Sequence, residues 1–377
     1  MTATAGALPR PSDLALLPRA AYHASVVSDY ALRTGLASAI AAASLPTAIG
    51  PVAKVERRRL AFYAELAASR DADFVFVPPQ GTAAVDVRAG RANGLPPDGR
   101  VELLRFPSTY VARNPELRRS YARHVRNATA RAQHWRHADG PRPTLLVIHG
   151  FGASPAWFNS AFFSLPRFFA EGWDVLLFTL PFHGSRRDPR AVNGLGLFAQ
   201  GLAGFSEALL HAIHDLRVVL ERLRRQGVPR IGVTGLSLGG YTSALLASVD
   251  HDLDFVIPNA AVTWLPPMLR AWFPASTALR AARALSGIPQ DVLEQALAVH
   301  SSLTYACRVP HDRRLIVAGL GDRLAPPEQS LLLWEHWDRP RLEWFAGSHV
   351  IHLGRRAYLD AMRDLVQHPR SDGDRDG

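Results

Sequence analysis

The stretch that decides the fold is residues 231–240, which read IGVTGLSLGG. A short β-branched run leads into the pattern G-x-S-x-G at Gly235–Gly239, and the residues that follow can form a helix. A serine on a sharp strand-to-helix turn has strained backbone angles, so its neighbours must be small. Gly235, Gly239 and Gly240 meet this need. The pattern therefore predicts that the Ser237 hydroxyl is held clear of the backbone, at the positive end of a helix.

The length and charge of the chain favour a globular α/β protein that does not bind nucleic acid. Its 377 residues suit one large domain with additions, or two domains. The net charge is +10, yet Lys54 is the only lysine among 43 basic residues, and the arginines are scattered. No basic stripe interleaved with aromatic residues appears, so we expect no nucleic-acid partner. A basic surface favours anionic substrates or membranes only weakly.

The single cysteine and the N-terminal sequence favour a cytoplasmic protein. Cys307 alone excludes an intramolecular disulfide and fits a reducing compartment. Asp13 and Pro18 interrupt the first twenty residues, which argues against a secretory signal. Residues 35–53 are uncharged but rich in alanine, glycine and serine, so we expect a packed helix there rather than a membrane anchor, with weak peripheral contact as the alternative.

Regular alternation of strands and helices predicts a doubly wound, mostly parallel sheet with helices on both faces. The expected domains are an N-terminal extension of helices and short strands over 1–125, a core over 126–367 with an insertion at 262–310, and a disordered tail over 368–377. The predicted strands of the extension and core are 74–78, 83–88, 101–106, 128–136, 144–148, 174–179, 231–234, 254–258, 314–318 and 341–345. The predicted helices are 53–69, 155–170, 202–226, the segment after Ser237, 327–337 and 351–366.

A serine hydroxyl is a weak nucleophile unless a base removes its proton and a third group orients that base. Asp322 follows the strand predicted at 314–318, and His349 follows the strand predicted at 341–345. Both lie at the edge of the sheet where ligands bind in open α/β folds. Asp312 precedes its strand and so lies at the wrong edge, while His352 competes with His349 but is expected in the first turn of the last helix.

The residues after the strand at 144–148 predict an oxyanion hole. They read His149-Gly150-Phe151-Gly152, and the Phe151 amide would pair with the Leu238 amide to bind a developing alkoxide. Core packing of a tight turn is the alternative for Phe151. No cluster of histidine, cysteine and carboxylate residues supports a metal site, and we expect no cofactor.

With these motifs the chain resembles the α/β-hydrolase fold superfamily over about residues 128–367. The matching motifs are HGFG at 149–152, GLSLGG at 235–240, GDRL at 321–324 and GSH at 347–349. The resemblance implies an acyl-enzyme mechanism with Ser237, His349 and Asp322, and it implies that the insertion at 262–310 is a cap over the active site.

Two features of this resemblance concern the substrate pocket. Residues 180–186 (LPFHGSR) are similar to the D-x-x-G-H-G-x-S loop of many esterases but lack its Asp and carry Phe182 in place of its glycine. His183 either contacts substrate or stabilises this loop. Trp264, Trp272 and Phe273 of the cap either line the pocket or fix the cap to the sheet.

We expect a serine hydrolase that cleaves a carboxylic ester, and we expect its partner to be a small-molecule acyl substrate. Amidase, peptidase and thioesterase activities use the same triad and remain alternatives. An acyltransferase and a non-catalytic hydrolase-like scaffold are disfavoured. The substrate, the oligomeric state and the role of residues 1–125 stay open at this stage.

Overall fold

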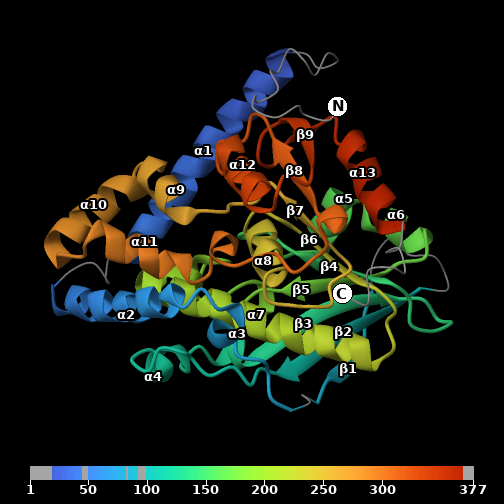
Figure 1. Ribbon diagram of the computed structural model, residues 1–377, viewed down its shortest axis with the longest axis horizontal. Helices are drawn as coiled ribbons and strands as arrows, with labels where there is room; N and C mark the ends of the chain where they lie inside the picture. The colour runs from blue at the N-terminus through green and yellow to red at the C-terminus, as the bar shows by residue number, and fades with distance from the viewer. Residues whose placement is uncertain (1–18, 45–49, 82–83, 92–98, 368–377) are drawn as a thin grey trace.

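The computed structural model describes residues 19–44, 50–81, 84–91 and 99–367 (Figure 1). Within these ranges the strands form one ten-stranded sheet in the order β1-β2-β3-β5-β4-β6-β7-β8-β9-β10. The pairs from β5 to β9 are parallel, whereas β1, β2 and β3 at one edge and β10 at the other pair antiparallel. The strands are β1 (Asp86–Ala89), β2 (Arg100–Pro107), β3 (Thr129–Arg136), β4 (Thr144–Ile148), β5 (Asp174–Thr179), β6 (Ile231–Leu236), β7 (Phe255–Asn259), β8 (Leu315–Gly319), β9 (Arg341–Gly347) and β10 (His352–Leu353). The doubly wound, mostly parallel sheet is confirmed.

Helices cover both faces of this sheet. One buried cluster joins the sheet to α5 (Ala156–Phe163), α6 (Leu165–Ala170) and α13 (Arg356–Gln367). The larger cluster, on the opposite face, includes α7 (Gly201–Arg225), α8 (Leu238–Leu246) and α12 (Pro327–His336). The remaining helices are α1 (Arg19–Ser44), α2 (Gly50–Ala68), α3 (Ala72–Val75), α4 (Arg118–Tyr121), α9 (Leu265–Ala271), α10 (Ala275–Ser286) and α11 (Gln290–Ala298), with short 3₁₀ turns between elements.

The stripe of leucine and isoleucine that predicted a helix over 202–226 is the buried face of α7. Its members Leu209, Ile213, Leu216, Leu220 and Leu223 are all 2% exposed or less. Because these positions recur at three- and four-residue spacing, they share one face of the helix, which packs on the sheet. The helix prediction is confirmed.

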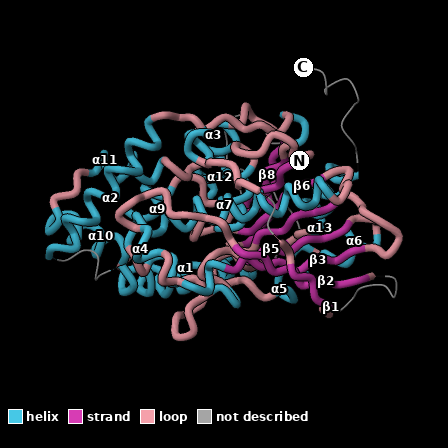
Figure 2. Tube along the Cα trace, turned by 90° about the horizontal axis from the view of Figure 1, so that it is seen from below, coloured by secondary structure: helices cyan, strands magenta, loops and turns pink. Residues whose placement is uncertain are grey.

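The N-terminal extension is not separate from the core. The strands β1 and β2 continue the sheet beyond β3, and α1 and α2 pack against α7 and the helices α10 and α11 of the insertion. The helices α2, α10 and α11 lie together beyond one end of the sheet, on the left in Figures 1 and 2. Among the residues that the structure describes, no helix is both long enough and apolar enough to cross a membrane.

Two predictions of local structure are wrong. The run at 74–78 is not a strand, because Asp71 accepts hydrogen bonds from the amides of Asp73 and Phe74 and so caps the short helix α3. The helix expected over 155–170 is broken into α5 and α6 at Ser164, whose backbone is left-handed (φ 54°).

The end of the chain also differs from expectation. His352 lies in β10 rather than in the first turn of the last helix, which begins at Arg356. The predicted disordered tail at 368–377 lies outside the described residues.

Candidate active site

Ser237 stands at the apex of a tight turn between β6 and α8. Its φ of 57° is unfavourable for a residue with a side chain, so the turn stores strain at this position. A Cβ at Gly239 would lie 2.0 Å from the Ile148 carbonyl oxygen, and one at Gly235 would lie 2.4 Å from the backbone of Gly239. Only glycine fits at either position, which is the physical reason for the motif.

Asp322 and His349 form a buried hydrogen-bonded pair. His349 Nδ1 lies 2.6 Å from Asp322 Oδ2, and the two side chains are 5% exposed or less. The other carboxylate oxygen, Oδ1, accepts hydrogen bonds from the amides of Leu324 (2.9 Å) and Ala325 (2.7 Å). The carboxylate is therefore fixed by its own loop and presents one oxygen to the imidazole.

Burial and charge act in opposite directions on this pair. Burial alone would lower the pKa of His349, but the adjacent Asp322 carboxylate outweighs it and raises that pKa above its usual value. Burial raises the pKa of Asp322, and the interaction with His349 opposes the increase. The imidazole is thus a stronger base than an ordinary buried histidine.

Ser237, Asp322 and His349 lie at the same edge of the sheet. They follow β6, β8 and β9. In the parallel part of the sheet β8 lies next to β9, and β7 alone separates β8 from β6. In the described part of the chain, no hydrogen bond joins Ser237 Oγ to His349. Such bonds are often long without substrate and tighten when it binds.

The two rival residues occupy other positions. His352 bonds through Nδ1 to Tyr358 Oη (3.0 Å) and through Nε2 to the His349 carbonyl oxygen (3.1 Å). Burial lowers its pKa to about 3, so it supports the loop as a neutral group. Asp312 is exposed and precedes β8, at the opposite edge of the sheet.

The loop after β4 lies beside the turn that carries Ser237. A Cβ at Gly150 would lie 3.6 Å from the Ser237 Cβ. Phe151 follows directly, and Leu238 begins α8. Among the described residues, neither of these two amides donates a backbone hydrogen bond. Two unpaired N–H groups beside a serine are the elements of an oxyanion hole.

His149 holds this loop in place. The Leu180 amide donates to its Nε2 (3.1 Å), so Nε2 carries no proton and Nδ1 donates to the Gly150 carbonyl oxygen (2.8 Å). Burial lowers its pKa to about 4. His149 is therefore a neutral group that ties the loop to the end of β5.

Ser237 opens into an apolar cavity of about 80 Å³. The only hydroxyls among its lining residues belong to Ser237 and Tyr241, and Tyr241 Oη is bonded to His300 Nδ1 (2.5 Å). The lining comes from α1, the loop after β4, the 3₁₀ turn before α7 and the start of α7, the Ser237 turn with the start of α8, the insertion at 262–310, and the loop after β8. The lining residues are Leu36, Ile40, Phe151, Phe198, Leu202, Phe205, Ser237, Leu238, Tyr241, Val262, Leu265, Met268, Leu269, Trp272 and Leu324.

The four residues predicted for the substrate pocket have different positions. Trp272 lines the cavity and is 4% exposed, whereas its neighbour Phe273 is 65% exposed and points to solvent. Trp264 does not line the cavity; its amide donates to Gln329 Oε1 (2.7 Å) and ties the start of the insertion to α12. The prediction that Trp264 and Phe273 line the pocket is therefore corrected.

His183 is also absent from the cavity wall formed by the described residues. It is fully buried, its Nδ1 lies 2.9 Å from the Pro181 carbonyl oxygen, and its ring packs edge-on against Phe151. Burial holds its pKa well below the usual value. It packs behind the Phe151 loop, as the loop-stabilising alternative requires, and it does not line the cavity.

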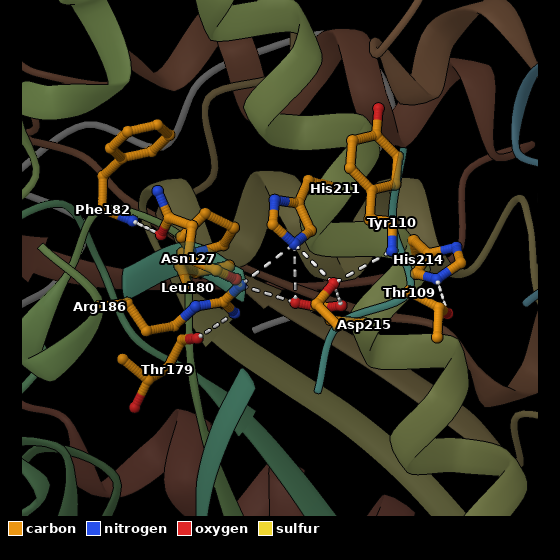
Figure 3. A network of polar contacts seen from close by, with 12 residues as sticks. Thr109, Tyr110, Asn127, Thr179, Leu180, Phe182, Arg186, His211, His214 and Asp215 are labelled. Atoms are coloured by element: carbon orange, nitrogen blue, oxygen red, sulfur yellow. Dashed lines mark hydrogen bonds and ion pairs between the residues drawn. The ribbon is translucent and has the colours of Figure 1, made fainter. Parts of the chain in front are cut away.

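A second polar cluster fixes the 180–186 loop to α7 (Figure 3). Arg186 and Asp215 are both fully buried and form an ion pair of 2.7 Å. The guanidinium also donates to the carbonyl oxygens of Asn127 (2.9 Å) and Thr179 (3.1 Å). His211 contacts both members of the pair, and burial lowers its pKa. Arg186 holds two backbone carbonyl oxygens and its charge is balanced by the buried Asp215, so the cluster fixes this loop to α7.

The sequence did not identify the contributions of α1 and α7 to the cavity. Leu36 and Ile40 are four residues apart on α1, and Leu202 and Phe205 three apart on α7, so each pair shares a helix face. That spacing indicates a buried face but not what the face covers. Within the described ranges, no group of three histidine, cysteine or acidic residues could hold a metal ion.

Comparison with known proteins identifies the fold family. The alpha/beta hydrolase family model matches residues 145–368. The structure is similar to acetyl xylan esterase 1 from a Thermoanaerobacterium species (TM-score 0.58, 16% identity, covering 81% of this chain and 92% of that one). It is also similar to an acetyl xylan esterase from a Paenibacillus species (TM-score 0.57, 14% identity, covering 82% and 94%). At such identities the likeness concerns the fold alone.

Two curated sequences from different strains of Mycobacterium tuberculosis, each named only as an uncharacterized protein, are 32% identical to this chain over 226 residues. The match covers 56% of this chain and 50% of each relative, so the chain spans about half the length of the curated relatives it matches. The family model covers more than half of the chain, from β4 to the end of α13. The chain therefore belongs to the alpha/beta hydrolase family.

Proposed function

We propose that the protein is a serine hydrolase that cleaves carboxylic esters with an apolar acyl group. The observation that carries the proposal is the opening of the strained Ser237 turn into an apolar cavity, at the sheet edge that holds the His349–Asp322 pair. The fold relatives that are named as esterases agree with a hydrolase but do not bear on its substrate.

In the proposed mechanism Ser237 Oγ attacks the ester carbonyl while His349 Nε2 accepts its proton. Asp322 keeps the Nδ1 proton on the side of the carboxylate, which leaves Nε2 free to act as the base. The amides of Phe151 and Leu238 would stabilise the oxyanion, and one such donor is worth roughly 3 kcal/mol in the transition state. His349 then protonates the leaving alcohol. In the second half-reaction His349 accepts a proton from water as the water oxygen attacks the acyl carbonyl, and it returns that proton to Ser237 Oγ as the acid leaves.

The cavity lining supports an apolar acyl chain. Each methylene group that leaves water contributes about 0.8 kcal/mol, or about fourfold in kcat/KM, as long as the cavity has room for it. Besides Ser237, the only side-chain polar group without a partner among the described lining residues is the Trp272 indole N–H, so a sugar or charged acyl group would lose most of its hydration without compensation. We therefore expect longer acyl chains to be preferred over acetyl.

A fluorophosphonate probe tests the nucleophile. Wild type should be labelled and Ser237→Ala should not. The matched control is Ser243→Ala, which removes a buried serine of the same helix whose hydroxyl bonds only the Gly240 carbonyl oxygen. Labelling of Ser237→Ala at the wild-type rate, or no labelling of folded wild type, would overturn the proposal.

Nitrophenyl esters of increasing chain length then test the acyl pocket, and the matching anilides and thioesters test the alternatives. We expect kcat/KM to rise from acetyl until the cavity is full. A strict preference for acetyl would contradict the apolar pocket, and faster cleavage of anilides than esters would favour an amidase or peptidase.

A further inference from the structure

The helix α1 packs directly on the loops that carry Asp322 and His349. It contacts β9 and the helix α10 of the insertion, and Figure 1 shows it running obliquely between these two elements. A Cβ at Gly321 would lie 3.0 Å from atoms of Tyr22 and Val26, so helix and acid loop are in close contact. This helix lies outside residues 145–368, which the family model covers.

One carboxylate of α1 bonds to both catalytic loops. Asp29 is 1% exposed, and its Oδ2 accepts the backbone N–H of His349 (2.8 Å) and that of Arg323 (2.9 Å). Arg323 directly follows Asp322. A single oxygen atom therefore links the backbone of the base to the backbone next to the acid.

We propose that Asp29 is a positioning residue for the Asp322–His349 pair, and that α1 completes the active site by supplying it. The inference rests on the proposed function of that pair. Asp29 does not line the cavity, so it acts through the two loops. Hydrogen bonds to a charged acceptor are stronger than neutral ones, which suits a contact that must hold two loops in register.

The charge of Asp29 also acts on the imidazole. It helps to raise the pKa of His349, together with the larger contribution of Asp322 and against the effect of burial. The other ionisable groups beside this contact include Tyr22 and Arg33 of α1, Arg323 of the acid loop and His352 of the histidine loop. His352 is neutral, and Arg33 donates to the Arg323 carbonyl oxygen (3.5 Å).

Two variants separate the hydrogen bonds from the charge. Asp29→Ala removes both, and displaced catalytic groups cost roughly 100-fold in kcat, with little change in KM because the cavity is intact. Asp29→Asn keeps an oxygen that can accept both N–H groups, so most of kcat should return. It removes the charge, so the acid limb of the kcat/KM profile should still move to lower pH, by up to about one unit. A merely structural role would not move this limb.

The matched control is Ser25→Ala. Ser25 is as buried as Asp29, lies one turn away on the same helix and bonds only the Tyr22 carbonyl oxygen. It should leave kcat and the pH profile unchanged, while thermal unfolding reports whether each variant is folded. Wild-type kcat in Asp29→Ala, or equal losses in the Ala and Asn variants, would overturn the proposal.

A second readout does not depend on ester cleavage. The Nδ1 proton shared by His349 and Asp322 should give a far-downfield proton NMR signal, identified by its loss in His349→Gln. In Asp29→Ala this signal should weaken or shift, and an unchanged signal would count against the positioning role. If wild type shows the signal but hydrolyses no ester, the proposed function fails while the role of Asp29 is still tested.

Discussion

Replacing Asp322 by asparagine should abolish most activity without disturbing the loop. Asp322 Oδ1 accepts two backbone amides, from Leu324 and Ala325, whereas Oδ2 faces His349 Nδ1. In Asp322→Asn the amide oxygen must stay on the two N–H donors, because an NH₂ group there would face them unfavourably. The NH₂ group then points at His349.

That orientation would place the imidazole in the wrong tautomer. An NH₂ donor facing Nδ1 makes Nδ1 an acceptor, so the proton moves to Nε2, the atom that must accept the proton of Ser237. Loss of the correct tautomer costs about ten-thousand-fold in kcat in a triad of this kind. KM should change little, since Asp322 does not line the cavity.

The assay is hydrolysis of the best nitrophenyl ester across a range of pH. Wild-type kcat/KM should fall as pH drops through the pKa of His349, which lies above the usual 6.5. In Asp322→Asn the attraction of the carboxylate is lost while burial remains, so the acid limb of the residual activity should move to lower pH. A loss in kcat below about tenfold would refute the tautomer argument.

The matched control for this substitution is Asp312→Asn. Asp312 is exposed and lies before β8 at the opposite edge of the sheet. It should keep wild-type kcat and an unchanged pH profile. An equal effect of the two substitutions would show that the loss comes from the charge of the protein as a whole and not from the geometry of the pair.

Three further predictions follow from packing and charge. Gly239→Ala should yield no folded, active enzyme in a circular dichroism and labelling assay, because its Cβ would lie 2.0 Å from a backbone carbonyl oxygen of β4. Asp215→Asn leaves the buried Arg186 without its counter-ion and should lower the free energy of unfolding in urea by about 3–5 kcal/mol. Burial opposes ionisation of Asp215, but its neighbours His211 and Arg186 hold its pKa well below the usual 3.8, so its contribution to stability is present above about pH 4 and is lost as the pH falls further. Trp272→Ala should shift the preferred acyl chain to a longer one in the nitrophenyl series, whereas the adjacent exposed Phe273→Ala should leave the profile unchanged.

The core of the fold could be predicted because its strands are apolar on both faces. The runs at 144–148 and 174–179 are almost wholly buried as β4 and β5, as expected of central parallel strands. The alternation of strands and helices also located Asp322 and His349, since each lies in the loop that follows a predicted strand. The expected role of each residue remains a prediction that the assays above address.

The wrong structural predictions concern segments in which a specific contact outweighs the secondary-structure preference of the sequence. The β-branched and aromatic run at 74–78 has strand composition, but Asp71 caps a helical turn there. In the insertion at 262–310, Trp272 and Phe273 are both aromatic, and composition alone could not tell which of the two faces the cavity. Such choices depend on tertiary packing, which a local pattern does not contain.

No local sequence pattern indicates the contact between α1 and the loops that carry Asp322 and His349. Asp29 and His349 are 320 positions apart, and an aspartate in a helix of small residues is ordinarily a solvent-exposed group. In the folded chain it is buried, and burying a carboxylate is unfavourable unless hydrogen bonds compensate for its lost hydration. The two N–H groups that provide this compensation come from the loops of the acid and the base. The stability of α1 on the sheet and the geometry of the pair are therefore coupled, and a substitution that loosens α1 should lower kcat before it unfolds the sheet.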